Sequence, residues 1–224
     1  TPFHNRTIAS MDLEEVKNTA IAYRERYVAL SKMEQLDLIT IFRNCGEKAG
    51  TSLEHPHSQI IATPIVPPHV RDPLYQSQLA CDTYGDCIYC GMMEEEKRQQ
   101  VRVVKETEYF LVICPFASRS PFETRIYPKI HRSSFVTISN QELVDFASVL
   151  QDTIKRLYVG LNDPDYNYII RSAPIEDREV KYHHWYVVIV PKLTTPAGFE
   201  IGTGIYINAT LPEQCAEFLR GVKI

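Results

Sequence analysis

The sequence contains no apolar stretch longer than a strand, and no positively charged segment followed by an apolar one opens it. We therefore expect neither a membrane-spanning helix nor a secretory signal, and we place the protein in the cytoplasm. Basic residues are not in excess either: 24 Lys and Arg stand against 28 Asp and Glu, and the cations are scattered. Proteins that bind duplex nucleic acid concentrate positive charge on one face. A nucleic-acid partner is not expected.

Cysteine is too sparse for a disulfide framework, with six residues in a chain of 224. Small secreted domains that depend on disulfides are shorter and richer in cysteine. The content of 44% apolar and 23% charged residues is typical of an ordinary folded protein. Two cysteines, Cys87 and Cys90, form a C-x-x-C pair, which in a reducing compartment indicates metal or redox chemistry. The other four are interpreted as plain thiols.

Patterns of helices and strands alternate along the chain. Asp12 and Glu15 form a capping signal followed by apolar residues at helical spacing, which predicts a helix over 12–31. A helix or strand end at 36–46 follows, then a strand beginning near His57, closed by prolines within 63–69, and then a linker to about Gly85. Beyond the linker we predict a β-meander over 102–128, a helix capped by Ser139, and strands within 165–174 and 183–191.

The order of these parts repeats. A lone histidine precedes each long helix (His4, His131), and another opens a strand that ends in proline (His55, His184), at nearly equal separations. We interpret this as an internal duplication, with residues 1–68 as the C-terminal part of a first copy and 69–224 as a linker and a second copy. The second copy has a meander and the C-x-x-C pair ahead of its histidine, whereas little precedes His4. We therefore expect an α+β fold, an antiparallel sheet with a long helix in each copy, and a first copy that is N-terminally incomplete.

Four residues of the second copy have the types of a tetrahedral Cys2His2 zinc site: Cys87, Cys90, His131 and His184. Their spacing is not that of a zinc finger. The duplication favours the site, because His4 and His55 occupy the matching places in the first copy. The alternative interpretation is that His131 is an ordinary surface histidine and His184 a hydrogen-bonded strand histidine.

On a strand His55, His57 and Gln59 would point to one face, because side chains alternate. His57 is not needed to complete four metal ligands, and neutral imidazole, with an unperturbed pKa of about 6.5, is a good nucleophile toward phosphorus. Gln59 could hold a phosphate oxygen without acting as an acid or base. The preceding turn, with Gly50, Thr51 and Ser52, offers backbone and hydroxyl donors suited to phosphate.

The run NCGEKAGTSLEHPHSQ, residues 44–59, resembles the active-site motif of the galactose-1-phosphate uridylyltransferase family, a branch of the histidine triad superfamily. Eight positions match that motif in register: Asn44, Gly46, Gly50, Ser52, His55, Pro56, His57 and Gln59. Segments 1–10 and 127–135 resemble those that carry the family's lone metal histidines, and 198–204 resembles its sugar-phosphate segment, where we select Phe199, Gly202 and Thr203. The resemblance covers nearly the whole chain.

The resemblance implies two histidine-triad-like domains and a specific chemistry. His57 would take a nucleoside monophosphate from a nucleotide sugar and hand it to a second phosphate acceptor, and Gln59 would favour transfer over hydrolysis. Asn44 and Ser52 would bind the phosphate and sugar side of the nucleotide, and His55 would bind zinc beside the nucleophile. In the second copy the position of His57 is Tyr186, so that copy would be structural. The family also implies a homodimer with sites shared across the interface.

One segment departs from the family. Thr203 and Gly204 follow Gly202 where the uridylyltransferases usually carry an aromatic residue and an acid. This change, with the C-x-x-C pair, resembles the adenylyltransferase branch that works as an ADP-glucose phosphorylase with inorganic phosphate. A non-catalytic, zinc-stabilised binding module is a further alternative, and a histidine triad hydrolase is disfavoured by Gln59. The base and the hexose stay open.

Overall fold

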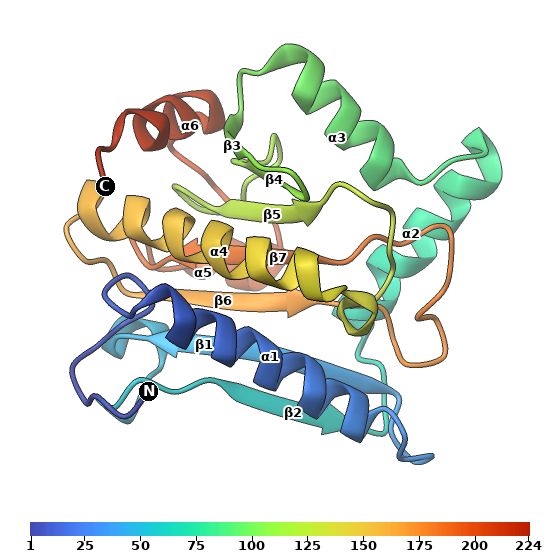
Figure 1. Ribbon diagram of the computed structural model, residues 1–224. Coiled ribbons are helices and arrows are strands. Elements are labelled where there is room, and N and C mark those ends of the chain that lie inside the picture. The colour runs from blue at the N-terminus through green and yellow to red at the C-terminus, as the bar shows by residue number, and fades with distance from the viewer.

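Seven strands form one antiparallel sheet in the computed structural model, which describes residues 1–224 (Figure 1). Their order across the sheet is β2-β1-β6-β7-β5-β4-β3. The strands are β1 (Leu38–Cys45), β2 (Gln59–Thr63), β3 (Val103–Glu106), β4 (Phe110–Ile113), β5 (Thr124–Pro128), β6 (Tyr166–Arg171) and β7 (Tyr186–Pro191). The α-helices are α1 (Leu13–Leu30), α2 (Pro68–Tyr84), α3 (Ile88–Gln99), α4 (Asn140–Gly160), α5 (Gly198–Thr203) and α6 (Pro212–Gly221).

The two long helices begin where their capping signals predict. The Glu15 carboxylate accepts a hydrogen bond from the Asp12 N–H at 3.0 Å, one residue before α1. At α4 the capping is reciprocal, because Ser139 N–H donates to Glu142 Oε2 at 2.7 Å and Glu142 N–H donates to Ser139 Oγ at 3.2 Å. Each contact satisfies a backbone N–H that a helix start leaves unpaired. No helix in the structure combines the length and the apolar character needed to cross a bilayer.

The main hydrophobic core lies between one face of the sheet and α1, α4 and α6. The alternation of strands decides which side chains enter it: Tyr166, Tyr168 and Ile170 of β6 are buried there. Trp185, which is completely buried, contacts the rings of Phe110, Phe135 and Phe146 in the same core; its centroid distances to them are 5.2–6.1 Å. A smaller cluster packs α3 against the other face.

The internal duplication is visible in the arrangement of the elements. The hairpins β1–β2 and β6–β7 lie side by side through pairing of β1 with β6, and α1 and α4 run next to each other across them (Figure 1). This confirms the predicted α+β fold of two histidine-triad-like copies. Because β1 pairs with β6, the sheet crosses the expected boundary at residue 68 without interruption.

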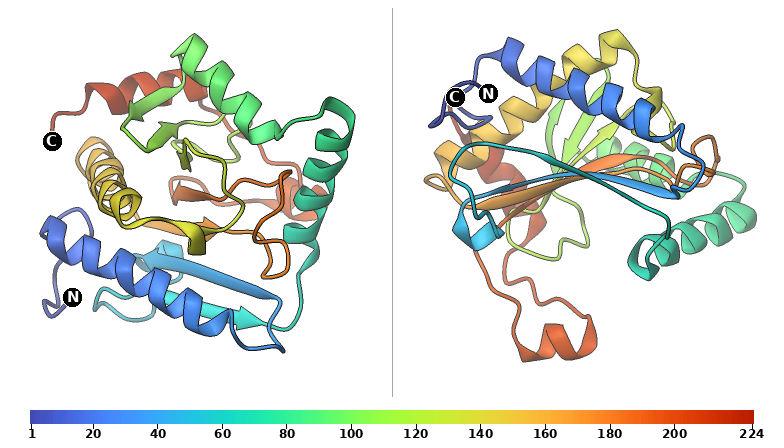
Figure 2. Two further views of the ribbon diagram at one scale, coloured as in Figure 1. Left: turned by 45° about the vertical axis from the view of Figure 1, so that its right-hand side comes forward. Right: turned by 90° about the horizontal axis from the view of Figure 1, so that it is seen from below.

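We call the face of the sheet away from α1 and α4 the open face. In the view from below in Figure 2, α1 and α4 lie on one side of the sheet, and α2 and α5 lie on the other. The loop that carries α5 stands away from the rest of the molecule in this view.

Two local predictions were wrong. The expected linker after residue 68 is the helix α2, in which Pro68 occupies the tolerated first position and Pro73 lies inside. The strand predicted from His57 begins at Gln59, so the two histidines precede it in a loop. The C-x-x-C pair lies at the start of a helix, because Cys87 is the N-cap of α3 and Cys90 lies in its first turn.

Candidate functional site

The residues of the 44–59 motif gather at the open face, at one edge of the sheet. In β1 the buried side chains Ile39, Ile41 and Arg43 alternate with positions that face the other way, among them Asn44. Gln59 opens β2 opposite Phe42 and is exposed. The motif therefore lies on strand ends and a loop supported by the sheet.

His57 is held so that one ring nitrogen stays available. Its Nδ1 lies 3.0 Å from the backbone oxygen of His55. A carbonyl oxygen only accepts hydrogen bonds, so Nδ1 carries the hydrogen and Nε2 keeps its lone pair. Nε2 has no hydrogen-bond partner within the protein and belongs to a half-buried side chain. This is the tautomer that a nucleophilic imidazole requires.

A chain of hydroxyl groups that begins with the buried tyrosines Tyr168 and Tyr23 holds the residue after His57. Tyr23 of α1 donates to Ser58 Oγ and also shares a hydrogen bond with the Tyr168 hydroxyl of β6. Burial raises the pKa of Tyr23 and of Tyr168, so both hydroxyl groups stay protonated and able to donate. The loop with His57 is thereby attached to the core through its neighbour. Neither tyrosine was selected from the sequence, because its partner is distant along the chain.

The turn before His57 depends on two glycines. Gly46 has φ +88°, and a Cβ built there would lie 2.0 Å from Asp165 Oδ1. The Asp165 carboxylate fills that space because it accepts a hydrogen bond from the Lys48 N–H at 2.6 Å. Gly50 has φ +84° with open space around it. Positive φ is the region that glycine adopts without steric cost.

The amide of Asn44 is oriented by an amide on the neighbouring strand. Asn167 Nδ2 donates to Asn44 Oδ1 at 2.8 Å and to the Ala49 oxygen at 2.8 Å. Because its oxygen is occupied, Asn44 keeps its NH2 group free as a donor toward the open face. Thr51 Oγ1 is buried without a partner, and Ser52 is exposed. Asn44 and Ser52 therefore offer free donors next to the His57 loop, while the Thr51 hydroxyl is covered.

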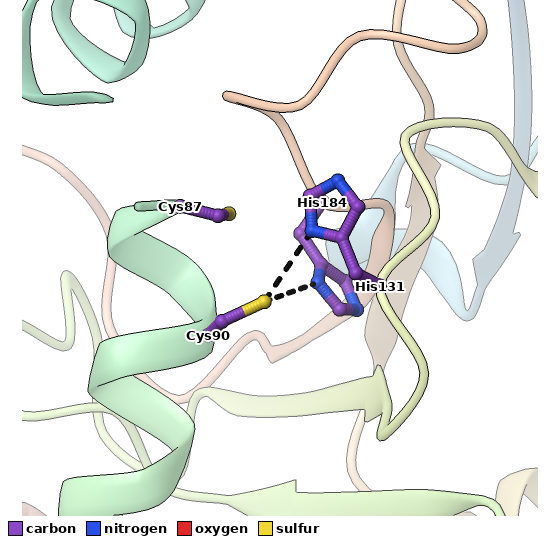
Figure 3. A group of neighbouring side chains, drawn as sticks. All are labelled: Cys87, Cys90, His131 and His184. Atoms are coloured by element: carbon purple, nitrogen blue, oxygen red, sulfur yellow. Dashed lines mark hydrogen bonds between the residues drawn. The ribbon is translucent and has the colours of Figure 1, made fainter. Parts of the chain in front are cut away.

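Cys87, Cys90, His131 and His184 come together in the second copy. Figure 3 shows the two cysteines at the start of α3 facing the two imidazoles. Their ligand atoms all lie within 4.8 Å of one another, and Cys90 Sγ is 3.3 Å from His131 Nδ1 and 3.6 Å from His184 Nδ1. A tetrahedral ion with bonds of about 2.3 Å to sulfur and about 2.0 Å to nitrogen separates such atoms by roughly 3.5 Å. The four residues fit a metal ion.

Contacts behind the ligands also suit a metal. His184 Nε2–H donates to the Pro128 oxygen at 2.7 Å, and His131 Nε2–H donates to the Val180 oxygen at 3.3 Å. Both bonds leave Nδ1 unprotonated and directed at the cysteines, which is how metal-binding histidines are usually oriented. A hydrogen bond from the Cys90 thiol lowers the pKa of Cys87, so this sulfur is available as a thiolate.

The first copy repeats half of this arrangement. The rings of His4 and His55 are 5.3 Å apart, as are those of His131 and His184. His55 Nε2–H donates to the Thr1 oxygen at 3.0 Å, and the two Nδ1 atoms of the pair are 3.2 Å apart. This pair brings two imidazoles together next to the His57 loop, while the four-residue group occurs in the second copy.

Known proteins are similar to this chain in sequence and in fold. Residues 1–67 match the family described as galactose-1-phosphate uridyl transferase, N-terminal domain. An ADP-glucose phosphorylase of Arabidopsis thaliana is 34% identical over 226 residues, which cover 100% of this chain and 63% of the relative. A galactose-1-phosphate uridylyltransferase of Thermotoga maritima is 32% identical over 233 residues, covering 100% of this chain and 72% of the relative. The chain belongs to the galactose-1-phosphate uridylyltransferase family.

Solved structures agree with this family assignment. The structure of an ADP-glucose phosphorylase from Arabidopsis thaliana with bound ADP-glucose has a TM-score of 0.93 and 34% identity, over 100% of this chain and 72% of that one. A uridylyltransferase structure has a TM-score of 0.92 and 31% identity, over 98% of this chain and 71% of that one. Both branches considered from the sequence are therefore represented among the family relatives.

The residues selected in the family's sugar-phosphate segment lie apart from the other candidates. Phe199, Gly202 and Thr203 belong to α5, and the Thr203 hydroxyl donates to the Phe199 oxygen within the helix. Phe199 is half exposed, and no hydrogen bond joins α5 to the His57 loop. Within this chain the sheet brings together the 44–59 motif but leaves α5 on the projecting loop (Figure 2).

Proposed function

We propose that this protein is a nucleotidyltransferase that moves a nucleoside monophosphate between a nucleotide sugar and a sugar phosphate through a covalent bond to His57. The single observation that carries the proposal is the hydrogen bond from His57 Nδ1–H to the His55 oxygen. It leaves Nε2 as a fixed nucleophile inside a motif with every family position present. Family membership supports the same reaction class.

The chemistry is two displacements at one phosphorus atom. In the first, the lone pair of His57 Nε2 forms a bond to the α-phosphorus, and the bond from that phosphorus to the bridging oxygen breaks. The electron pair leaves on that oxygen, which releases hexose 1-phosphate. In the second, an oxygen of the acceptor phosphate attacks, and the phosphorus–nitrogen bond breaks. The His55 carbonyl stabilises the positive charge that the imidazole carries while it is bonded to phosphorus.

The neighbouring groups would hold the phosphate. Gln59 can donate its amide N–H groups to a phosphate oxygen, and it cannot exchange a proton with water as a histidine could. Asn44 and Ser52 supply further free donors, and Thr51 lies between them in the sequence. Backbone N–H groups of the turn at Gly50 add to them.

For the metal site we propose zinc, held by Cys87, Cys90, His131 and His184. Two thiolates and two imidazoles in a closed set of four ligands are typical of structural zinc, which supplies folding free energy and takes no part in the reaction. His4 and His55 are proposed as two ligands of a corresponding first site. Thiolate ligands and free cysteines suit a reducing compartment, and we propose the cytoplasm.

A second candidate function is ADP-glucose phosphorylase, in which inorganic phosphate accepts the adenylyl group. It is favoured by the departure at Thr203 and Gly204 and by the similarity of the whole chain to the Arabidopsis enzyme. The two candidates share the covalent step and differ in the base carried by His57 and in the acceptor.

One experiment tests both candidates. The purified protein is incubated separately with UDP-glucose, UDP-galactose and ADP-glucose, and intact mass is measured before and after acid treatment. We expect an acid-labile adduct of UMP or of AMP, and its mass identifies the branch. The adduct should be absent from His57→Ala. An adduct on that variant, or none on the wild type with any of these sugars, would contradict the covalent mechanism.

We also propose a homodimer. The projecting loop exposes large apolar side chains: Phe199, Ile201, Ile205 and Ile207 are each more than half exposed. An exposed apolar segment of this kind suits contact with a second copy. Light scattering of the purified protein should give twice the mass of one chain, and a monomer at micromolar concentration would contradict this.

A further inference from the structure

A cavity of about 570 Å³ lies on the open face over β6 and β7. Ile169 and Val188 form part of its floor, and the start of α2 and the segment after β7 form its sides. No residue of the 44–59 motif lines it. Pockets that bind small molecules have volumes of about 300–1,000 Å³, so this cavity is of the size of a nucleotide site.

The duplication relates this cavity to the His57 site. His184 Nε2 binds the Pro128 oxygen as His55 Nε2 binds the Thr1 oxygen, so His184 and His55 are equivalent in geometry. Two residues further along each segment stand Tyr186 and His57, and Tyr186 lines the cavity. The cavity therefore occupies, in the second copy, the place where the first copy carries its reactive histidine.

Cations that form no ion pair line this place. Arg171 stands directly opposite Tyr186 in the pairing of β6 with β7, and its half-buried side chain has no hydrogen bond or ion pair. The side chains of Lys192 and Arg119, which also line the cavity, form no ion pair either. Arg119 lies over the Tyr206 ring, 5.3 Å from its centre.

The carboxylates of the cavity do not neutralise these cations. Glu123 is paired with Arg125 at 2.8 Å, so the two charges compensate each other. Glu200 accepts a hydrogen bond from the Ala197 N–H at the start of α5. Asp72 is an exposed residue of α2. Three cations without an ion pair therefore remain against two carboxylates, Glu200 and Asp72, in a chain whose net charge is −4.

A buried imidazole completes the lining. His183 is 6% exposed, and neither of its ring nitrogens has a hydrogen-bond partner. The Tyr89 ring lies edge-on to it, with the ring centres 5.5 Å apart. A buried polar group without a partner costs free energy, which a ligand that offers hydrogen bonds would recover. Aromatic rings and a free imidazole suit the base or ribose of a nucleotide.

We propose that this cavity is a second, non-reacting binding site for a nucleoside 5′-monophosphate, with Arg171 binding the phosphate beside Tyr186 and with His183 and Tyr89 contacting the nucleoside. A tyrosine hydroxyl at this place cannot form the labile phosphorus–nitrogen bond that His57 is proposed to form, so the second site would retain its ligand unchanged. The proposal does not rely on transfer by His57, because binding and adduct formation are measured separately.

Photolabelling of the purified protein with 8-azido-AMP and 5-azido-UMP, followed by peptide mapping, tests the site. We expect labelled peptides that contain Tyr89 or residues 169–192, in addition to any label near residues 44–59. Arg171→Gln should reduce the labelling of the first group about tenfold or more, because it removes a charged hydrogen-bond donor to phosphate. Unlabelled AMP or UMP should compete.

The matched control is Arg26→Gln, which removes an exposed arginine without partners on α1, across the sheet from the cavity. Its labelling should equal that of the wild type. Label confined to residues 44–59 in the wild-type protein would overturn the proposal, and this outcome does not depend on whether a variant folds. Unchanged labelling of Arg171→Gln, or an equal loss in Arg26→Gln, would also overturn it. Inorganic phosphate that competes as well as AMP or UMP would refute the nucleoside contacts.

Discussion

Replacing Gly46 with alanine tests how the turn before His57 is held. The backbone at Gly46 has φ +88° and ψ 160°, a region occupied almost only by glycine, where another residue costs about 1–3 kcal/mol. A Cβ there would also lie 2.0 Å from Asp165 Oδ1, so the carboxylate must move and lose its bond to the Lys48 N–H. A hydrogen bond to a charged group contributes about 1.5–3 kcal/mol. We expect Gly46→Ala to lower the free energy of unfolding by about 3–5 kcal/mol.

Two other glycines distinguish the backbone cost of an alanine at positive φ from the loss of the Asp165 hydrogen bond. Gly50 has φ +84° and open space around it, so Gly50→Ala should show the backbone cost alone, about 1–2 kcal/mol. Gly91 lies in α3 with nothing near its missing side chain, so Gly91→Ala should stabilise the protein by about 0.5–1 kcal/mol. Urea unfolding followed by circular dichroism measures all three. The reasoning is refuted if Gly46→Ala is no more destabilised than Gly50→Ala.

Three further predictions concern the two sites. Cys87→Ser/Cys90→Ser should lose zinc and unfold at a lower temperature, as metal analysis and thermal unfolding will show, and unchanged metal content would exclude the proposed ligand set. His57→Ala should lose several orders of magnitude of activity, whereas Gln59→Ala should lose about 2–4 kcal/mol of transition-state stabilisation, and initial rates should give the parallel lines of ping-pong kinetics. Tyr23→Phe should lower the free energy of unfolding by about 1–3 kcal/mol, because it leaves buried hydroxyl partners unsatisfied; a variant as stable as the wild type would show that the hydroxyl chain does not hold the loop.

The parts of the fold that the sequence predicts well are those with local causes. Both long helices begin at their capping residues, and the meander from β3 to β5 follows from short apolar runs separated by turns. The helix α2 was missed because Pro68 and Pro73 argue for a linker, and because its buried side is narrow, with only Leu74 and Ser77 buried. Proline is compatible with the first position of a helix, which Pro68 occupies, so its presence alone does not exclude a helix.

The same distinction between local and long-range causes applies to the residues of the candidate sites. The meeting of Cys87 and Cys90 with two distant histidines was predicted because the repeat supplied long-range information. Asp165, Asn167 and Tyr168 were not selected, since their roles depend on the pairing of β6 with β1, which no local pattern specifies. Residues that support a motif from another strand become visible only when the register of the sheet is known.

The pairing of β1 with β6 connects the two candidate sites, which lie in separate sequence motifs. Asn44 of β1 pairs with Asn167 of β6. β6 also pairs with β7, and His184 lies just before β7. Cooperative units in proteins often coincide with hydrogen-bonded elements that open together. Release of the proposed zinc near α3 would therefore weaken amide protection not only in β7 and β6 but also in β1, beside the loop of His57. The order of that loop would then depend on four ligands that all lie outside the 44–59 motif.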